Sequence, residues 1–277
     1  MHLGRQRPGM LSTFVNMDLQ LSGKVFIVTG GSKGIGEAIT QVLAEEGAIP
    51  FIASRSVAES EQLVAQLKKS SRESAFLPGD LSDLETCKKV VHACIERFGR
   101  IDGIVNNAGL NDGAGLEKGS PAAFRDSMYK NLYHYYDLVH FALPYLKTSK
   151  GSIVNISSKV ALTGQGHTSG YAAAKGAQLA LTREWAAELL PYGIRVNAVI
   201  PAEVMTPLYE NWLQSAFPDP VAKEREISAK IPLEQRMTSK REIADMVVFL
   251  LSPRSSHTTG QWLIVDGGYV HLDRALT

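Results

Sequence analysis

The chain has 277 residues, 44% of them hydrophobic, and a formal net charge of +1. This length and composition suit one large α/β domain with a sizeable core. A charge so close to zero excludes a broad electrostatic attraction to nucleic acid or to an anionic membrane surface. No apolar run approaches the roughly 20 residues needed to span a bilayer, so we expect no membrane partner.

The first sixteen residues differ in character from the rest of the chain. They include the basic Arg5 and Arg7 but no apolar segment of the kind found in signal peptides, so no secretory signal is expected. Residues 1–16 are predicted to be a flexible extension, and Met17 is an alternative start. Residues 17–277 are predicted to form a single domain, because neither a repeat nor a low-complexity linker divides them.

Short β-rich runs alternate with helix-length amphipathic segments along this domain. Strands are predicted at residues 24–29, 51–54, 75–77, 101–106, 152–157, 195–200 and 262–265. Helices are predicted at residues 35–46, 57–69, 83–98, 121–146, 171–190 and 239–251. Continuous apolar strands that alternate with helices are typical of a parallel sheet covered on both faces. We therefore predict an α/β fold with one doubly wound parallel sheet and helices on both faces.

Pro50 lies where the second strand is expected to start. Proline has no N–H group and cannot donate to an interior ladder. The ladder of this strand is therefore expected to begin at or just after Pro50.

The two cysteines, Cys87 and Cys94, are seven residues apart, which fits one face of the predicted helix 83–98. This spacing favours small buried side chains over a disulfide framework or a zinc site. We expect no metal site and a reducing compartment such as the cytoplasm.

A glycine-rich turn connects the first predicted strand to the first predicted helix. Its sequence, TGGSKGIG at residues 29–36, places Gly30, Gly34 and Gly36 in a GxxxGxG pattern. Such a turn lets backbone N–H groups approach a pyrophosphate at a helix N-terminus. Glycine-rich turns also occur as tight connections alone, but the strand before and the helix after this one favour a dinucleotide site.

The residues after the second strand bear on which dinucleotide binds. An acidic side chain there would bind the ribose 2′-hydroxyl of NAD, but residues 54–56 are Ser-Arg-Ser. Arg55 and Lys33 can instead bind a 2′-phosphate, because a guanidinium matches phosphate geometry. The alternative is that Arg55 is an ordinary solvated arginine. The pattern favours NADP and leaves NAD open.

Polar residues also follow the third and fourth strands. Asp80 and Leu81 can border the adenine, although Asp80 fits an ordinary helix cap equally well. Asn106 and Asn107 begin the sequence NNAG at the end of the fourth strand. Ligands of open α/β sheets bind at this edge, so the two amides are expected to fix backbone and cofactor edges.

Tyr171 and Lys175 open the helix that follows Ser157 and Ser158, and their i, i+4 spacing puts both on one face. A free tyrosine, with a pKa near 10, is a poor base at neutral pH. A lysine ammonium and an oxidised nicotinamide nearby would lower that pKa. The pair alone also describes an ordinary helix surface, but its position after the serine strand favours a catalytic pair.

Together these segments resemble the short-chain dehydrogenase/reductase family over residues 17–277. The matching segments are TGGSKGIG at 29–36, NNAG at 106–109, Asn131, Ser158, YAAAK at 171–175 and VDGG at 265–268. The resemblance implies a Rossmann-like fold and an NAD(P)-dependent oxidoreductase that acts on CH–OH donors. It also implies a catalytic tetrad of Asn131, Ser158, Tyr171 and Lys175, in which the spacing to Tyr171 selects Ser158 over Ser157.

The resemblance implies a role for each member of the tetrad. Tyr171 would take the proton of the substrate hydroxyl, and Ser158 would hydrogen-bond the reacting oxygen. Lys175 would bind the nicotinamide ribose and lower the pKa of Tyr171, and Asn131 would hold a water that relays the proton outward. The cofactor would accept the hydride. The implied cofactor-binding residues are Gly30, Ser32, Lys33, Gly34, Ile35, Gly36, Arg55, Asp80, Leu81, Asn107, Ala108, Gly109, Tyr171, Lys175, Pro201, Val204 and Thr206.

The segment after the sixth strand departs from the family pattern. The family usually has Pro-Gly there, whereas this chain has Pro201-Ala202-Glu203. Glu203 would place a carboxylate on the substrate side, which a fatty or steroid pocket disfavours because burying an unpaired charge is costly. The alternative is that Glu203 faces solvent or pairs with a basic neighbour. The candidate substrate-binding residues are Asn111, Asp112, Ser158, Gln165, His167, Glu203, Tyr209 and Trp212.

This mixture of carboxylates, amides and aromatic side chains suits a sugar. Three longer stretches, NISSKVALTGQGHTSGY, IPAEVMTPLYENW and SHTTGQWLIVDGGYVHLDRAL, resemble a bacterial L-fucose dehydrogenase subgroup. That resemblance implies oxidation of the anomeric hydroxyl of L-fucose, or of L-galactose or D-arabinose, to a lactone. One alternative is a 3-oxoacyl thioester reductase, although residues 203–230 offer no clear basic cluster for its acidic carrier protein. Another is a non-catalytic dinucleotide-sensing module, which the filled tetrad disfavours.

The resemblance further implies a homotetramer in which the helices at 121–147 and 171–190 pack across an interface. The apolar residues of these helices agree with this prediction, although core packing would explain them as well. Residues 271–274 are a candidate to reach the pocket of a neighbouring subunit.

Overall fold

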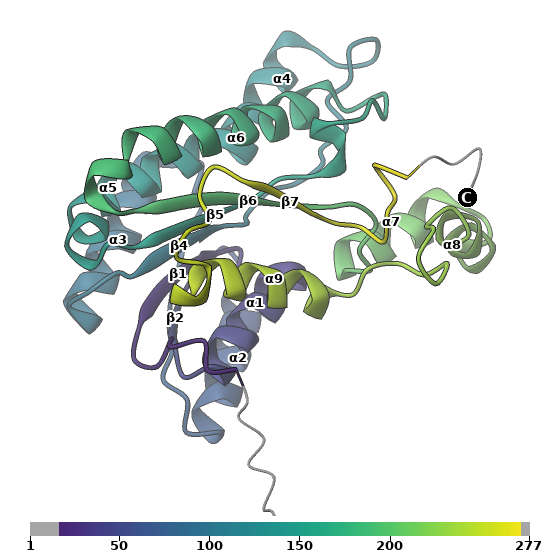
Figure 1. Ribbon diagram of the computed structural model, residues 1–277. Helices are drawn as coiled ribbons and strands as arrows, with labels where there is room; N and C mark the ends of the chain where they lie inside the picture. Colours follow the sequence, from purple (N-terminus) through teal and green to yellow (C-terminus); the bar gives the residue numbers. More distant parts are fainter. Residues whose placement is uncertain (1–16, 273–277) are drawn as a thin grey trace, which may run out of the picture.

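Seven parallel strands form one sheet in the computed structural model, which describes residues 17–272 (Figure 1). The strand order is β3-β2-β1-β4-β5-β6-β7, and every neighbouring pair is parallel. The strands are β1 (Val25–Thr29), β2 (Ile49–Ser54), β3 (Ala75–Pro78), β4 (Gly103–Asn106), β5 (Ser152–Ile156), β6 (Arg195–Pro201) and β7 (Trp262–Val265). The predicted doubly wound parallel sheet is confirmed. The predicted extension at 1–16 and the last residues of the predicted tail contact lie outside the described residues.

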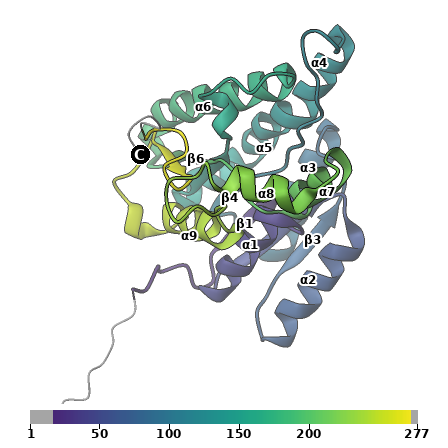
Figure 2. The same ribbon diagram turned by 90° about the vertical axis from the view of Figure 1, so that its right-hand side faces the viewer.

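Helices cover both faces of this sheet, as Figures 1 and 2 show. The helices are α1 (Gly34–Glu45), α2 (Val57–Lys69), α3 (Leu84–Phe98), α4 (Pro121–Met128), α5 (His134–Ser149), α6 (Ser169–Glu188), α7 (Pro207–Ala216), α8 (Pro220–Ser228) and α9 (Lys240–Leu251). Helices α1, α2 and α9 pack on one face, and α3, α5 and α6 pack on the other. Within the described part of the chain, none of these helices has the length and apolar character that crossing a membrane requires.

The core follows from the alternation of side chains along buried strands. In β1, Val25 and Ile27 pack with α3 and α5, whereas Phe26 and Val28 pack with α1 and α9. Each strand of this kind must be apolar on both sides, which explains the continuous hydrophobic runs of the sequence. Cys87 and Cys94 are free and buried among the apolar side chains beneath α3, and burial raises the pKa of each thiol to about 12.

The start of β2 differs from the prediction. The strand begins at Ile49, one residue before Pro50, and Pro50 lies opposite Phe26 of β1. Because Ile49 donates its N–H to the carbonyl of Lys24, the residue before β1, the nitrogen of the next residue points to the other side of the strand. On that side the pairing with β3 begins only at Phe51, so the missing N–H of Pro50 leaves no ladder bond unmade.

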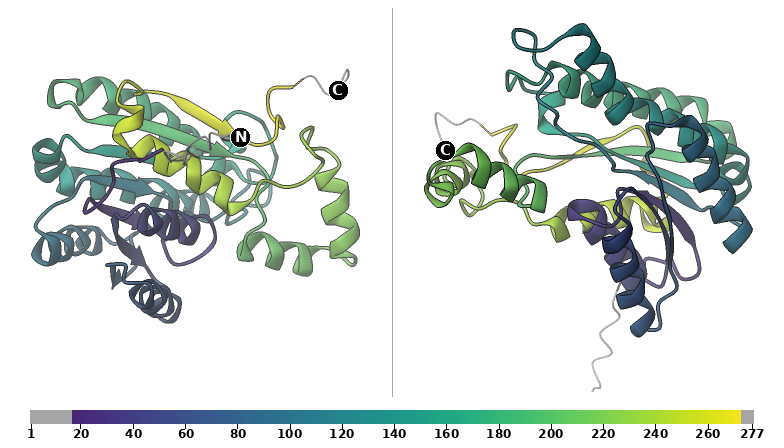
Figure 3. Two further views of the ribbon diagram at one scale, coloured as in Figure 1. Left: turned by 60° about the horizontal axis from the view of Figure 1, so that its bottom comes forward. Right: turned by 180° about the vertical axis from the view of Figure 1, so that it is seen from behind.

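The predicted helical region over 121–146 is confirmed, but it is not one uniform α-helix. A π-helix, η1 (Tyr129–Tyr133), separates α4 from α5 and contains Asn131. Such widened turns are rare and often occur at functional sites. Helices α7 and α8 were not predicted, and they project beyond the carboxyl edge of the sheet in both views of Figure 3.

The strand order reverses between β1 and β4, since the chain moves outward to β2 and β3 and then returns to β4. In open parallel sheets, ligands bind at such a reversal, outside the carboxyl ends of the strands. The fold therefore predicts a ligand site at the loops that follow β1 and β4.

Candidate active site

The turn after β1 has a backbone that only glycine allows at its tightest point. Gly30 and Gly34 have φ values of +62° and +57°, in the left-handed region. A Cβ on Gly36 would lie 2.2 Å from the carbonyl oxygen of Gly30. The side chain of the N-cap residue Lys33 makes no capping hydrogen bond, so the first backbone N–H groups of α1 are available to an anion.

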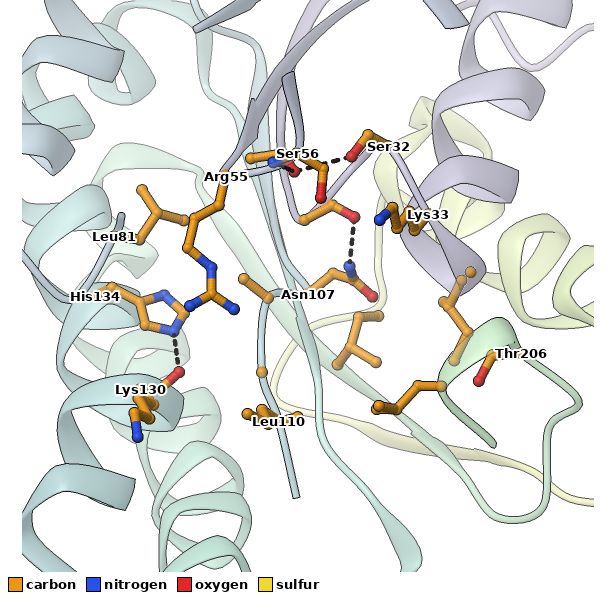
Figure 4. A pocket seen from close by; sticks show the side chains of 18 of the residues that line it. Ser32, Lys33, Arg55, Ser56, Leu81, Asn107, Leu110, Lys130, His134 and Thr206 are labelled. Carbon is orange, nitrogen blue, oxygen red and sulfur yellow. Dashed lines mark hydrogen bonds between the residues drawn. The ribbon is translucent and has the colours of Figure 1, made fainter. Parts of the chain in front are cut away.

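A cleft of about 510 Å³ opens at this turn and crosses the reversal point of the sheet. Figure 4 shows side chains from both sides of the cleft, among them Ser32, Asn107 and Thr206. The predicted cofactor-binding residues that line it are Gly30, Ser32, Lys33, Gly34, Ile35, Arg55, Asp80, Leu81, Asn107, Ala108, Gly109, Tyr171, Lys175, Pro201, Val204 and Thr206. Gly36 does not line the cleft and acts instead through the close packing of the turn.

Asn107 joins the loop after β4 to the glycine-rich turn. Its Nδ2 donates to the carbonyl of Thr29 at 2.9 Å, and its backbone N–H donates to the Thr29 hydroxyl at 2.8 Å. The backbone N–H of Ala108 donates to the same hydroxyl at 2.9 Å. The neighbouring Asn106 is buried in the sheet, where its Nδ2 donates to Asn155 of β5 at 2.9 Å. Of the two predicted amides, Asn107 alone lines the cleft.

Lys33 and Arg55, the two basic residues predicted to bind the 2′-phosphate of NADP, both have acidic partners. Lys33 lies 2.6 Å from Glu59, and Arg55 lies 3.8 Å from Asp80. All four side chains are exposed to solvent, where ion pairs contribute little to stability. The pKa of Asp80 is lowered, first by the backbone N–H of Ser82 and then by the Ser82 hydroxyl and Arg55. An incoming phosphate could therefore replace either acidic partner at small cost.

His134 lines the same cleft and was missed by the sequence reasoning (Figure 4). Its Nε2 lies 3.1 Å from the carbonyl of Lys130, and a carbonyl only accepts, so Nε2 carries the proton. Burial lowers the pKa of His134 to about 4, and its Nδ1 has no hydrogen-bond partner within residues 17–272. A polar residue one helical turn after Asn131 is the signal that could have identified it.

Tyr171 and Lys175 lie on one face of α6, as their spacing predicts. The Nζ atom of Lys175 is 5.4 Å from the centre of the Tyr171 ring. It donates to the carbonyl of Ile156 at 2.7 Å and approaches the Tyr135 hydroxyl at 3.5 Å. Burial lowers the pKa of Lys175 to about 7. Burial also raises the pKa of Tyr171 to about 12, although a hydrogen bond with Ser158 opposes that shift.

Asn131 is buried, and protein groups occupy each of its polar atoms. Its Oδ1 accepts the backbone N–H of Leu110 at 2.7 Å, and its Nδ2 donates to the carbonyl of Ser127 at 3.0 Å. Its own backbone carbonyl accepts Nε2 of Gln178 at 2.6 Å. A Cβ on Gly109 would lie 3.0 Å from Asn131 Oδ1 and 3.5 Å from Lys175 Nζ, so these three residues converge.

Glu203 forms a buried ion pair with Lys159, the residue after Ser158. The other oxygen of this carboxylate accepts the Tyr209 hydroxyl at 2.7 Å. Lys159 also lies 4.4 Å from the centre of the Tyr269 ring. Glu203 is therefore paired with a basic neighbour, which was one of the two alternatives left open by the sequence. Glu203 does not line the cleft.

The other candidate substrate-binding residues, apart from Ser158, lie outside the cleft as well. Asn111 and Asp112 are in the loop after β4, where Asp112 accepts the Ser127 hydroxyl at 3.0 Å. Gln165 and His167 are exposed in the loop before α6. The two loops touch, because a Cβ on Gly115 would lie 3.0 Å from the His167 Cα. In α7, the ring of Trp212 packs 5.2 Å from that of Tyr209.

The cleft fits a dinucleotide by its own geometry. Glycines at its floor allow close backbone approach, and the N-terminus of α1 faces it. The exposed cations are Lys33 in the glycine-rich turn and Arg55 at the end of β2. The unpartnered Nδ1 of His134 offers an acceptor beside it. No three His, Cys, Asp or Glu side chains of residues 17–272 gather as metal ligands.

Three kinds of similarity to known proteins agree with this geometry. A family profile described as enoyl-(acyl carrier protein) reductase matches residues 30–270. L-fucose dehydrogenase of Bos taurus is 39% identical over 253 residues, or 91% of each chain. 3-Oxoacyl-(acyl-carrier-protein) reductase FabG of Thermotoga maritima is 35% identical and covers 91% of this chain and 100% of its own. The crystal structure of Cj0485 dehydrogenase matches with a TM-score of 0.89 and 49% identity, covering 94% of this chain and 99% of that chain.

Proposed function

Because the chain belongs to the short-chain dehydrogenase/reductase family of NAD(P)-dependent oxidoreductases, we propose that it oxidises the anomeric hydroxyl of an aldose to a lactone. L-fucose and sugars of like configuration are the proposed substrates. The observation that carries the proposal is the meeting of Ser158, Tyr171 and Lys175 at one end of a glycine-lined cleft. The similarity to L-fucose dehydrogenase supports a sugar as the substrate.

In the proposed reaction, Tyr171 is the general base for the sugar hydroxyl. Without substrate, the Ser158 hydroxyl hydrogen-bonds Tyr171 and favours its ionised form, and in the reaction it donates this hydrogen bond to the reacting oxygen instead. Burial raises the pKa of Tyr171 to about 12 even though the Ser158 hydrogen bond lowers it, and this is too high for a base at neutral pH. Positive charge must therefore accumulate beside the phenol before it can act, and the ammonium of Lys175 is the protein's own source of it.

NAD(P) supplies the hydride acceptor, the C4 atom of its nicotinamide, when it is bound. The glycine-rich turn and α1 would hold the pyrophosphate, and Val204 and Thr206 would border the nicotinamide carboxamide. Lys33 and Arg55 support a preference for NADP, since both can exchange an exposed carboxylate for a 2′-phosphate. Asp80 and Leu81 would border the adenine.

Polar groups around Ser158 support a sugar over an apolar substrate. The ion pair of Lys159 and Glu203 begins at the residue beside Ser158, and Tyr209 extends it to α7. A hydroxylated substrate can form hydrogen bonds with the half-buried Tyr209 end of this cluster, whereas an apolar substrate offers it none. The further proposed sugar contacts are Asn111 and Asp112 in the loop after β4, Gln165 and His167 in the loop before α6, and Trp212 in α7.

Initial rates over a panel of aldoses, each with NADP and with NAD, test the proposal. We expect cofactor reduction with L-fucose, and a loss of about 10²- to 10⁴-fold in kcat for Tyr171→Phe, since that is the usual contribution of a general base. Binding of NADPH, followed by its fluorescence, should persist in Tyr171→Phe. Absence of turnover with every aldose would exclude the substrate class.

A reductase of 3-oxoacyl thioesters is the second candidate. The 35% identity to FabG of Thermotoga maritima over its whole length favours it. Oxidation of NADPH by acetoacetyl thioesters, at a kcat/KM above that for any aldose, would make it the better assignment.

The proposed assembly is a homotetramer in the cytoplasm. Tyr129, Tyr133 and Tyr136 expose their rings along η1 and α5, in the region predicted to pack across an interface. The free thiols of Cys87 and Cys94 agree with a reducing compartment.

A further inference from the structure

Gln178 is a fully buried amide in α6, close to one helical turn after Lys175. Its Nε2 donates to the backbone carbonyl of Asn131 at 2.6 Å, and its Oε1 accepts from Lys175 Nζ at 3.3 Å. We propose that Gln178 is a positioning residue, whose amide holds the ammonium of Lys175 in place against the π-helix that carries Asn131. This inference rests on the proposed roles of Tyr171 and Lys175.

The orientation of the amide follows from its two partners. A carbonyl can only accept a hydrogen bond, and an ammonium can only donate one. The nitrogen of Gln178 must therefore face Asn131, and the oxygen must face Lys175. A Leu or Met side chain would fill a similar volume without the cost of burying an amide, so packing alone gives no reason for glutamine at this position.

Gln178 supplies one of three acceptors around the Lys175 ammonium. The others are the Ile156 carbonyl at 2.7 Å and the Tyr135 hydroxyl at 3.5 Å. No carboxylate of residues 17–272 forms an ion pair with Nζ, and the titratable side chains that face it are Tyr171 of α6 and Tyr135 and His134 of α5. Each neutral acceptor thus matters, because hydrogen bonds to the charged form are what oppose the effect of burial on this lysine.

The sheet holds the helix turn that carries this amide. Thr182 donates its hydroxyl to the backbone carbonyl of Gln178 at 2.8 Å, and Asn155 of β5 donates to the Thr182 hydroxyl at 2.9 Å. Asn106 of β4 donates to Asn155 at 2.9 Å. These hydrogen bonds begin in β4 and β5. Asn107 follows the end of β4, and Ser158 follows the end of β5. Gln178 is therefore anchored to the elements that form the site.

The test measures the ionisation of Tyr171 directly and needs no sugar. Ultraviolet difference absorbance is recorded against pH for the NADP complex, with the matching Tyr171→Phe protein as the blank for the other tyrosines. Loss of an acceptor in Gln178→Met favours neutral Lys175, which removes positive charge from the side of the phenolate. We expect the midpoint of Tyr171 ionisation to rise by up to about one pH unit, because the hydrogen bond lost from the Lys175 ammonium sets the upper limit of the effect on Tyr171.

Leu179→Met, at the next position in the helix, is the matched control for packing, and it should leave the midpoint unchanged. Gln178→Leu serves if Gln178→Met does not fold, because it also removes the acceptor and should also raise the midpoint. If the midpoint is unchanged in either folded Gln178 variant, Gln178 has only a structural role. This conclusion would hold whatever the thermal stability of the variant. Aldose turnover does not enter this measurement, so failure of the proposed substrate would leave the result interpretable.

Discussion

At the scale of single residues, the site combines a tyrosine and a lysine that burial shifts in opposite directions. The pKa of Tyr171 rises to about 12 and that of Lys175 falls to about 7. Both shifts have the same cause, since burial disfavours whichever form is charged. Hydrogen bonds favour the charged forms of both side chains: Ser158 acts on Tyr171, and Gln178 is one of the acceptors of the Lys175 ammonium.

Cofactor preference is a residue-scale prediction. Arg55→Ser should weaken NADPH binding by about 10- to 100-fold, because it removes a charge-assisted hydrogen bond to phosphate, and it should change NADH binding by less than about threefold. Fluorescence titration with both reduced cofactors measures this. Arg241→Ser removes the same charge from α9 and should alter neither affinity. An equal loss of affinity for both cofactors would mean that Arg55 does not bind the 2′-phosphate of NADPH.

At the scale of elements, the glycine-rich turn is held to its path by the close contact of Gly36 with Gly30. Gly36→Ala places a methyl group 2.2 Å from a carbonyl oxygen, so the turn must move. We expect a loss of about 1–3 kcal/mol in the free energy of unfolding, as in other overpacked sites, and loss of NADPH binding. Chemical denaturation and fluorescence titration measure the two effects.

Gly176→Ala is the control for that substitution. Gly176 lies in α6, and apart from its own helix turn a Cβ there would meet no atom of residues 17–272 within 4 Å. Replacing a helical glycine by alanine should raise stability by about 0.5–1 kcal/mol. Similar losses in the two variants would mean that the contact in the turn is not what makes Gly36 necessary.

The loss of folding stability at acid pH is a prediction for the whole molecule. The pKa of His134 is about 4 in the fold, against 6.5 as its ordinary value, so the unfolded chain binds a proton that the folded chain excludes. Stability should therefore fall as the pH falls from about 6.5 to about 4, by up to about 3 kcal/mol from this residue. His134→Gln should flatten this part of the curve in chemical denaturation, and exposed His257→Gln should not. Parallel curves for all three proteins would contradict the assignment.

Assembly is also decided at this scale. Light scattering should give a tetramer, and Tyr136→Glu should lower the measured mass, because it places a charge among the exposed rings of α5. Leu116→Glu, at an exposed loop position, should leave the mass unchanged. A stable monomer in the unaltered protein would end the proposal.

Local chemistry made much of this protein predictable from its sequence. Apolar runs and turn residues predicted every strand of the sheet, and the bounds of α2 and β7 agree residue for residue with the structure. The glycine pattern and the i, i+4 spacing of Tyr171 and Lys175 depend only on neighbours in the chain, so they predicted the turn and the shared helix face correctly.

Contacts between distant segments decided the rest. The register of β2 against β3 made Pro50 acceptable, and the partners Leu110 and Gln178 surround the widened turn at Asn131. Glu203 meets Lys159 across 44 positions of sequence, and only the parallel order of β5 and β6 brings their loops together. A hydrogen bond of this kind depends on which strand ends become neighbours, and no local pattern in the sequence contains that choice.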